Sequence, residues 1–388
     1  MLDIIIVGGG PAGLAFARAL DGAGLSVAVV ERASRAQLAE PESDGREIAL
    51  THRSVETLKS LGAWGRIDAD EVSPLREARV YNGHSHLALS FNTLGGAEDR
   101  LGQLVPNHLI RRALFRSLEE QPGLALVTDS VVAQVRRTPH AVEAVLADGR
   151  ILRARLLVAA DSRFSSVRDQ LGIAAEINRL GKSMMVVRVA HERPHDGVAT
   201  EWFDHGQTLA ILPLNGNRAG AVLTLASGAI DALMKLDAAA LSAELTRRFQ
   251  GRLGAMSVIE PAHAYPLATT WSRHFAATRA VLIGDAAVGM HPVTAHGFNF
   301  GLSGAAKLAQ LVRQAAERGG DIAAPMLLRR YEAAHRAATF PLYTATNMLV
   351  GLYTDERPVA RLARQAALVA GARLPIVRGS VSRLLMQH

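Results

Sequence analysis

Cysteine is absent from this chain of 388 residues. Its absence excludes a disulfide framework, a thiolate metal site, a cysteine-linked cofactor and a dithiol reductase. No uninterrupted apolar run reaches the length that spans a membrane. The first predicted strand begins at residue 2, which leaves no room for a cleaved signal, so the sequence predicts a cytoplasmic protein.

Aromatic residues make up only 5% of the chain and charged residues 20%, whereas 49% is hydrophobic, which is typical of an ordered globular protein. Acidic residues (36) are fewer than Lys and Arg (43), so the formal net charge is +7. The arginines are scattered, with no basic block interleaved with aromatic residues, and we expect no nucleic-acid partner. No His, Asp and Glu residues have the spacing of metal ligands, and no Gly-x-Ser-x-Gly elbow is present. We therefore expect neither a metal site nor serine hydrolase chemistry.

The chain begins with the pattern of a dinucleotide-binding unit. An apolar strand, Ile4–Val7, runs into a glycine turn that opens a helix, and a second apolar strand ends at Glu31. In this pattern Gly8 permits the tight turn, Gly10 lets the backbone approach a pyrophosphate, and Gly13 lets the helix pack closely on the sheet. The helix N-terminus stabilises the phosphate charge, and the carboxylate of Glu31 accepts hydrogen bonds from a ribose. The predicted cofactor contacts here are Gly8, Gly10, Ala12, Gly13, Glu31 and Arg32.

A second motif lies far along the chain, where an apolar strand reaches Gly284–Asp285 and Pro292 turns the chain into a helix of small residues. Asp285 is placed to bind a second ribose or ribityl hydroxyl, and the backbone amides of Gly297–Asn299 face an anionic ring edge. An ordinary strand, turn and helix is disfavoured because both motifs occur in order. We therefore predict non-covalent FAD, with further contacts at Asp285, Pro292, Gly297, Phe298 and Asn299.

Three segments carry a resemblance to a known family: Gly8–Gly13, Leu157–Arg168 and Gly284–Asp285. They resemble the fingerprints of the single-component FAD-dependent aromatic hydroxylases, the class A flavoprotein monooxygenases. Within that group the chain is similar to the ubiquinone-biosynthesis hydroxylases, and most to the subset with broad ring-position selectivity. Segments 44–50, 54–64, 105–114 and 347–353 support the narrower match. The chain departs from the family pattern at Ser162, Val288 and His296, where the family usually has Gly, His, and Gln or Lys.

The order of predicted elements indicates an α/β protein. Strands alternate with helices in segments 1–72, 98–178 and 272–320, which we expect to form a Rossmann-like FAD-binding domain with a parallel sheet. Polar and apolar residues alternate in segments 73–97 and 179–271, which predicts an inserted antiparallel sheet. The resemblance, whose founding member is para-hydroxybenzoate hydroxylase, implies that this sheet is the floor of the substrate pocket. Residues 321–388 form the predicted C-terminal helical region, with breaks near Pro341, Pro358 and Pro375.

The resemblance also implies the reaction. FAD reduced by NADH or NADPH reacts with O2 to give a flavin C4a hydroperoxide, which hydroxylates the ring of a polyprenylated phenol or benzoquinol in ubiquinone biosynthesis. Asp161 belongs to the second fingerprint, and the family places side chains beside the flavin at Arg46 and Asn107. A surface arginine and a helix N-cap are the respective alternatives for these two residues. His291 and His296 bracket the turn beside the flavin and are the candidate catalytic residues, although buried histidines more often serve packing.

The C-terminal segment contains arginines spaced among Ala, Leu and Val at roughly helical intervals. They are Arg357, Arg361, Arg364, Arg373, Arg378 and Arg383. Such a segment fits two interpretations, a peripheral contact with an anionic membrane surface or a tail packed on the protein's own core. Two alternatives to the hydroxylase also stay open. One is a related FAD oxidoreductase acting on another phenolic or prenyl substrate, and the other is a weakly catalytic FAD-binding scaffold among other ubiquinone-biosynthesis proteins.

Overall fold

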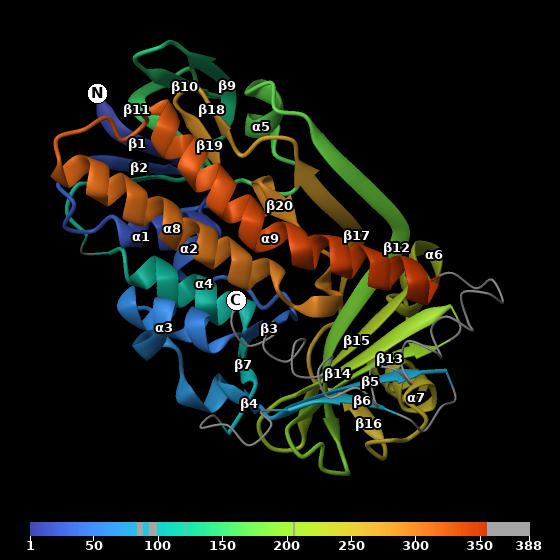
Figure 1. Ribbon diagram of the computed structural model, residues 1–388. Helices are drawn as coiled ribbons and strands as arrows, with labels where there is room; N and C mark the ends of the chain where they lie inside the picture. Colours follow the sequence, from blue (N-terminus) through green and yellow to red (C-terminus); the bar gives the residue numbers. More distant parts are fainter. Residues whose placement is uncertain (84–87, 93–98, 120, 205, 355–388) are drawn as a thin grey trace.

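The computed structural model describes residues 1–83, 88–92, 99–119, 121–204 and 206–354. Within these residues the strands form three sheets, of eight, nine and three strands. The eight-stranded sheet lies at the end of the molecule where the chain begins, and the nine-stranded sheet lies toward the opposite end (Figure 1). Two long helices, α8 (Gly297–Glu317) and α9 (Pro325–Thr354), pack on each other beside these sheets.

The eight-stranded sheet has a parallel centre in the order β19, β11, β1, β2, β8. A parallel sheet is covered on both faces, so its strands need apolar residues throughout, and Ile4–Ile6 of β1 are fully buried. Its strands are β1 (Leu2–Val7), β2 (Val27–Val30), β8 (Leu124–Val127), β9 (Val132–Arg137), β10 (Val142–Leu146), β11 (Ile151–Ala159), β18 (Ala276–Ala277) and β19 (Ala280–Leu282). The helices around it include α1 (Pro11–Ala19), α2 (Arg35–Ala39), α3 (His52–Ser60), α4 (Asn107–Arg116) and α5 (Ser166–Gln170).

The nine-stranded sheet is antiparallel except at one place, where β13 pairs with β5 in parallel. The wholly antiparallel sheet expected from the sequence is therefore wrong at this pair, because β5 enters the sheet from a distant part of the chain. The strands are β5 (Glu77–Asn82), β6 (Leu89–Phe91), β12 (Ala175–His191), β13 (Val198–Asp204), β14 (Gln207–Pro213), β15 (Arg218–Ala226), β16 (Met256–Val258), β17 (His263–Ser272) and β20 (Val288–Gly289). Helices α6 (Ser227–Leu233) and α7 (Ala238–Arg248) pack on one face.

A small sheet joins the two larger ones. It consists of β3 (Glu47–Leu50), β7 (Gly102–Pro106) and β4 (Ser73–Leu75). The strand positions differ slightly from the predicted segment limits. Strand β4 falls in segment 73–97, predicted for the inserted sheet, but pairs with β7 of the small sheet. Strand β12 of the nine-stranded sheet begins within segment 98–178, predicted for the FAD-binding domain. The short strand β20 falls in 272–320 and pairs with β17 of the nine-stranded sheet. Two covered sheets linked in this way confirm the predicted α/β fold class.

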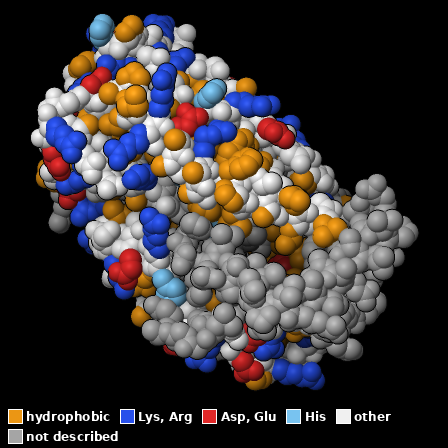
Figure 2. Space-filling model, viewed as in Figure 1, with side chains coloured by type: hydrophobic (Ala, Val, Ile, Leu, Met, Phe, Trp, Pro, Cys, Tyr) orange, Lys and Arg blue, Asp and Glu red, His pale blue; other side chains and the backbone are white. Residues whose placement is uncertain are grey.

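Helix α9 runs through Pro341 without a break. The predicted break is wrong, although proline removes one helical hydrogen bond, because packing holds the helix on both sides: Tyr331, Thr339 and Leu342 are all buried. Hydrophobic side chains gather over the C-terminal half of α9 (Figure 2). No helix in the part of the chain that the structure describes is long and apolar enough to cross a membrane. The predicted breaks at Pro358 and Pro375 and the arginines from Arg357 to Arg383 lie outside the described residues.

Candidate active site

The three motif glycines of the turn after β1 differ in their steric surroundings. Gly8 has φ +112°, and a Cβ there would lie 2.4 Å from the carbonyl oxygen of Ala160. A Cβ on Gly13 would lie 2.0 Å from the carbonyl oxygen of Gly8, so α1 packs directly against the turn. A Cβ on Gly10 meets no described atom within 4 Å. The first two glycines are therefore required by the fold, whereas Gly10 leaves space for a ligand.

Helix α1 begins at Pro11 with Gly10 as its N-cap, and no described side chain caps it. The amides of its first turn lack intrahelical acceptors, and together with the helix dipole they favour an anion. Glu31, directly after β2, accepts hydrogen bonds from the backbone N–H groups of Gly9 (2.5 Å) and Ala33 (2.9 Å). Each carboxylate oxygen has two lone pairs, so Glu31 keeps acceptor capacity for a ribose.

The second motif comes close to the first. A Cβ on Gly284 would lie 3.0 Å from the Cβ of Ala12, and Gly301 of α8 approaches the same two residues. Asp285 lies in the short helix η3 (Gly284–Ala286), and its carboxylate pairs with the guanidinium of Arg163 at 2.9 Å. The sequence motifs do not single out Arg163 as a site residue. Small residues thus bring the N-termini of α1 and α8 together around one space.

A cavity of about 890 Å³ joins the glycine turn to the nine-stranded sheet. Most predicted site residues line it, namely Gly8, Gly10, Ala12, Glu31, Arg32, Arg46, Asn107, Asp161, Asp285, His291, Pro292, Gly297 and Phe298. Three other predicted residues, Gly13, His296 and Asn299, are not among the described lining residues. The cavity is within the size range of ligand sites and combines an apolar lining with a few polar groups.

Arg46 and Asn107 are held in place by one carboxylate. Asp44 accepts hydrogen bonds from Arg46 Nη2 (2.6 Å) and Asn107 Nδ2 (2.7 Å). The guanidinium of Arg46 also lies 5.3 Å from the ring centre of Tyr265, as in a cation–π contact. Burial raises the pKa of Asp44, but the pairing with Arg46 outweighs burial and holds that pKa below its usual value. The N-cap interpretation of Asn107 is wrong, because Pro106 is the N-cap of α4 and Asn107 is its first residue.

The two candidate histidines, His291 and His296, differ in their surroundings. His291 lines the cavity, and its Nδ1 accepts a hydrogen bond from the N–H of Val293 at 3.2 Å. Burial lowers the pKa of His291 to about 4. At neutral pH the ring is therefore uncharged, and with Nδ1 as acceptor the proton is on Nε2, which makes His291 a hydrogen-bond donor. His296 is buried, with its ring 6.1 Å from that of Phe300.

The side chain of Asn299 is hydrogen-bonded within the protein through both its oxygen and its nitrogen. Its Oδ1 accepts from the N–H of Thr51, and its Nδ2 donates to the carbonyls of Ala49 and Ala295. These bonds fix the start of α8 against β3. A contact between Asn299 and a cofactor would therefore use its backbone amide, which belongs to the first turn of α8 and lacks an intrahelical acceptor.

The second fingerprint and its departures serve mainly local structure. Asp161 lines the cavity, but its carboxylate accepts from Ser165 Oγ (2.6 Å) at the start of α5, and burial raises its pKa. Ser162 does not have a positive φ, and its Oγ accepts from the N–H of Phe164. Val288 is buried in β20 opposite Trp271. Like Ser162, Val288 has no positive φ.

The floor of the cavity comes from one face of the nine-stranded sheet. Two rows cross the strands in register, Glu201–Ala210–Val222–Val186 and Phe203–Thr208–Thr224–Met184. All eight side chains line the cavity. The opposite face carries Trp202, Leu209, Leu223 and Met185, which are buried in a separate core with α6 and α7. The family resemblance implies a substrate floor from this sheet but singles out none of these residues.

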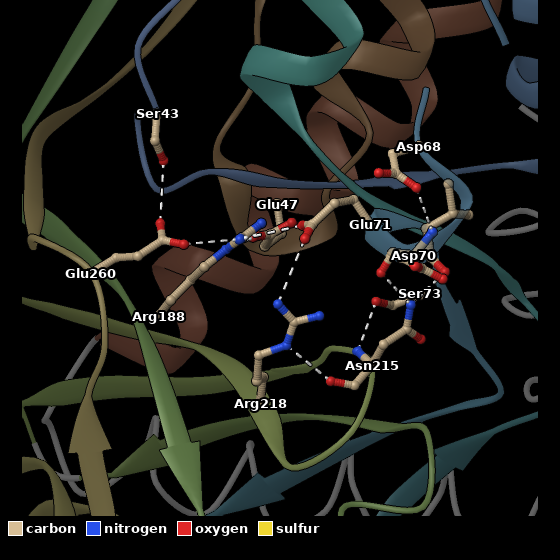
Figure 3. Close-up of polar contacts among 11 residues, drawn as sticks. Ser43, Glu47, Asp68, Asp70, Glu71, Ser73, Arg188, Asn215, Arg218 and Glu260 are labelled. Atoms are coloured by element: carbon tan, nitrogen blue, oxygen red, sulfur yellow. Dashed lines mark hydrogen bonds and ion pairs between the residues drawn. The ribbon is translucent and has the colours of Figure 1, made fainter. Parts of the chain in front are cut away.

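A buried ionic cluster fixes this sheet to the cofactor side (Figure 3). Arg188 of β12 donates to Glu47 of β3 (2.7 Å) and to Glu260 (3.0 Å), and approaches Glu71 at 3.4 Å. Arg218 pairs with Glu71 from the other side at 3.6 Å. The side chains of Arg188 and Glu47 are 7% and 1% exposed, so the contact is dry. Burial raises the pKa of Glu47 despite Arg188, and the neighbouring Glu260 and Glu71 act in the same direction as burial.

Comparisons with known proteins agree with this geometry. A family described as FAD binding domain matches residues 1–341. The ubiquinone hydroxylase UbiM of Neisseria meningitidis is 42% identical over 387 residues, which cover 99% of this chain and 84% of the relative. The ubiquinone hydroxylase UbiL of Rhodospirillum rubrum is 36% identical over 386 residues, covering 100% and 89%. The structure of p-nitrophenol 4-monooxygenase PnpA from Pseudomonas putida matches with a TM-score of 0.77 at 19% identity, covering 100% and 97%, which shows a shared fold.

The matching family model and the ubiquinone hydroxylase relatives show that this cavity, a dinucleotide clamp that opens onto a sheet floor, belongs to a flavoprotein monooxygenase. The chain belongs to the FAD-binding-domain family and, within it, to the ubiquinone hydroxylases.

Proposed function

We propose that this chain hydroxylates the aromatic ring of a polyprenylated phenol or benzoquinol in ubiquinone biosynthesis. FAD is the bound cofactor, NADH or NADPH is the electron donor, and O2 provides the inserted oxygen atom while its second atom leaves as water. The observation that carries the proposal is the single cavity that joins the glycine turn and Asp285 to the sheet floor. Its relatives named ubiquinone hydroxylases support the choice of substrate class.

The residues present fit FAD. The open space at Gly10, the uncapped N-terminus of α1 and the acceptor Glu31 suit the pyrophosphate and one ribose. Asp285 and the first turn of α8 suit the ribityl chain and the ring edge at the other end. When bound, FAD supplies the redox chemistry and the activation of O2, while the protein supplies binding and orientation.

The chain's own residues define what happens around the cofactor. The first-turn amides of α8 stabilise negative charge on an adjacent ring by their dipoles. His291 offers a neutral N–H donor because its pKa of about 4 keeps the ring uncharged at neutral pH. The apolar floor residues, such as Val186 and Val222, exclude water from the space in which a substrate ring would lie.

Quinone profiling tests the proposed pathway in cells. Deletion of the gene is expected to accumulate a prenylated precursor that lacks one or more ring hydroxyls, as detected by mass spectrometry. Wild-type protein restores ubiquinone, whereas Gly10→Val does not, because it blocks the cofactor space. An unchanged quinone pool after deletion, or a precursor that lacks a different group, contradicts the proposal.

We also propose that the C-terminal half of α9 contacts an anionic membrane surface that carries the substrate. Met348 and Leu349 expose apolar side chains there, and their neighbour Val350 lines the cavity. Exposed apolar side chains next to a cavity-lining residue fit a lipid-borne substrate. The alternative is delivery of the substrate by another ubiquinone-biosynthesis protein.

Two methionines on α9 provide a matched test of this contact. Met348 is 71% exposed and Met326, at the other end of the helix, is 73% exposed. Met348→Glu is expected to reduce flotation of the FAD-bound protein with anionic vesicles several-fold, while Met326→Glu leaves it unchanged. Equal loss in both variants, or a wild-type protein that does not float, argues for delivery by a partner.

A further inference from the structure

Glu201 is the one carboxylate on the two-row floor defined above. It lies in the middle of β13 between Ala199 and Phe203, which share its face of the strand. Its register partners are Ala210 on β14 and Val80 on β5, and neither carries charge. The side chain lines the cavity, so the carboxyl group is the main polar feature of an otherwise apolar row.

The carboxyl group of Glu201 has no hydrogen bond or ion pair with any residue that the structure describes. This differs from the other carboxylates of the cavity, since Glu31, Glu47, Asp161 and Asp285 all have partners. Glu201 is half-buried and lines the cavity, so its carboxyl oxygens can accept from a ligand that brings a donor there.

We infer that Glu201 binds the ring hydroxyl of the substrate and accepts its proton during hydroxylation, an inference that rests on the proposed function. In this step the phenol O–H bond breaks and its electron pair stays on oxygen, where it increases the nucleophilicity of the ring. The proton forms a new O–H bond on the Glu201 carboxylate. No additional oxidant or reductant takes part in the transfer.

The burial of Glu201 favours this role. Burial raises the pKa of Glu201 to about 8 from its ordinary value of 4.5. A phenol has a pKa of about 10. Proton transfer to the Glu201 carboxylate is therefore unfavourable by about two pKa units, whereas transfer to a carboxylate of ordinary pKa would be unfavourable by more than about five. A base with a pKa close to the working pH is also best suited to general base catalysis.

Other titratable groups reach the cavity from neighbouring elements. Lys182 of β12 and Tyr265 of β17 come from the same sheet, and Arg46, Glu47, Arg163, Asp285 and His291 come from the cofactor side. Burial alone accounts for the raised pKa of Glu201, with no contribution from these charges. A titration that depends on Glu201 can therefore be separated from theirs by substitution of Glu201.

The test uses full-length, FAD-bound protein and two probes, a phenol with one prenyl unit and its methyl ether. The test variant is Glu201→Gln. The control is Glu317→Gln, which makes the same substitution at an exposed residue at the end of α8. Isothermal titration in buffers of different ionisation enthalpy measures affinity and protons released. Wild type and Glu317→Gln are expected to prefer the phenol at least about tenfold, as for a hydrogen bond to a charged group. At neutral pH they should release protons on binding the phenol, because the bound hydroxyl favours the ionised carboxyl.

In Glu201→Gln the proton release is expected to disappear, and turnover should fall at least about 100-fold. In the control Glu317→Gln, FAD content, turnover and the oxidation of NADH or NADPH without substrate should remain unchanged. If Glu201→Gln does not retain FAD, Glu201→Asp replaces it and should keep proton release at lower affinity. Proton release and turnover that survive in Glu201→Gln overturn the inference. A wild type that shows Glu201-dependent proton release but no hydroxylated product supports this inference and contradicts the proposed function.

Discussion

The glycine clamp and the substrate floor are built by opposite means. The clamp binds through backbone amides and through the absence of side chains at Gly8, Gly10 and Gly13, all within one short segment. The floor consists of side chains from four strands that are aligned only by their register, such as Glu201 and Val186. A site made from local backbone leaves a recognisable motif, whereas one made from cross-strand neighbours does not. The substrate floor is therefore the part of the site that no sequence motif describes.

The largest effect is expected from Gly10→Val, which tests whether the clamp is a ligand site rather than a fold requirement. A branched side chain fills the space of the pyrophosphate without meeting the protein. FAD affinity should fall at least about 100-fold, which is about 2.7 kcal/mol, while the thermal stability of the FAD-free protein changes little. Absorbance of bound flavin and circular dichroism measure the two properties.

Two further glycines control this result. Gly65 also has open space around it but lies away from the cavity, so Gly65→Val should retain FAD. Gly13→Ala should instead destabilise the FAD-free protein, because its Cβ would clash with the carbonyl of Gly8. Stoichiometric FAD in Gly10→Val contradicts the clamp.

Arg188→Met breaks the connection between the two regions. It leaves the buried carboxylate of Glu47 without its cation, which typically costs about 3–5 kcal/mol. The deficit should grow as the pH rises, because Glu47 already has a raised pKa and loses the partner that favours its ionised form. Urea unfolding at about pH 5 and about pH 8 measures this difference.

The control for Arg188→Met is Arg247→Met, which removes an arginine that is 68% exposed on α7. Exposed ion pairs contribute little, so this variant should be nearly as stable as wild type. Equal losses in the two variants would mean that the buried cluster does not hold the sheets together.

On the substrate floor, Glu201→Gln should alter how the stability of the protein depends on pH. In the folded protein Glu201 keeps its proton up to about pH 8, whereas in the unfolded chain it ionises near 4.5. The wild type therefore loses stability relative to Glu201→Gln as the pH rises through this window, by about 1.4 kcal/mol for each unit of pKa shift at most. Thermal melts of the FAD-free proteins across this range provide the comparison. A difference that is constant with pH refutes the raised pKa.

The smallest effect is expected from Asp285→Ala. The carboxylate is 37% exposed and shared with Arg163, so its loss should weaken FAD binding by about tenfold, or about 1.4 kcal/mol, and should slow flavin reduction. Asp148→Ala, which removes an exposed partner of Arg150, is the control. Unchanged FAD affinity and an unchanged rate of flavin reduction would mean that the Gly284–Asp285 motif is only a turn.

The sequence predicts the fold class and the FAD cofactor because apolar runs and glycine spacing are local properties. It does not identify Arg188 or Glu201, whose roles depend on strand register. A weak signal exists for both: Arg188 interrupts the apolar run of β12, and Glu201 stands between apolar residues of the same strand face. The break at Pro341 was predicted from local geometry, but tertiary packing of α9 overrode it.

The most direct test of the proposed function follows the oxygen atom. Purified FAD-bound protein is incubated with a short-chain prenylated phenol, NADH or NADPH, and O2 labelled with the heavy isotope. We expect a phenolic product that has gained one labelled oxygen atom, in proportion to the nicotinamide oxidised and with little hydrogen peroxide. Oxidation of the nicotinamide that yields only hydrogen peroxide, with no labelled product from any prenylated phenol or quinol, would contradict the proposed function.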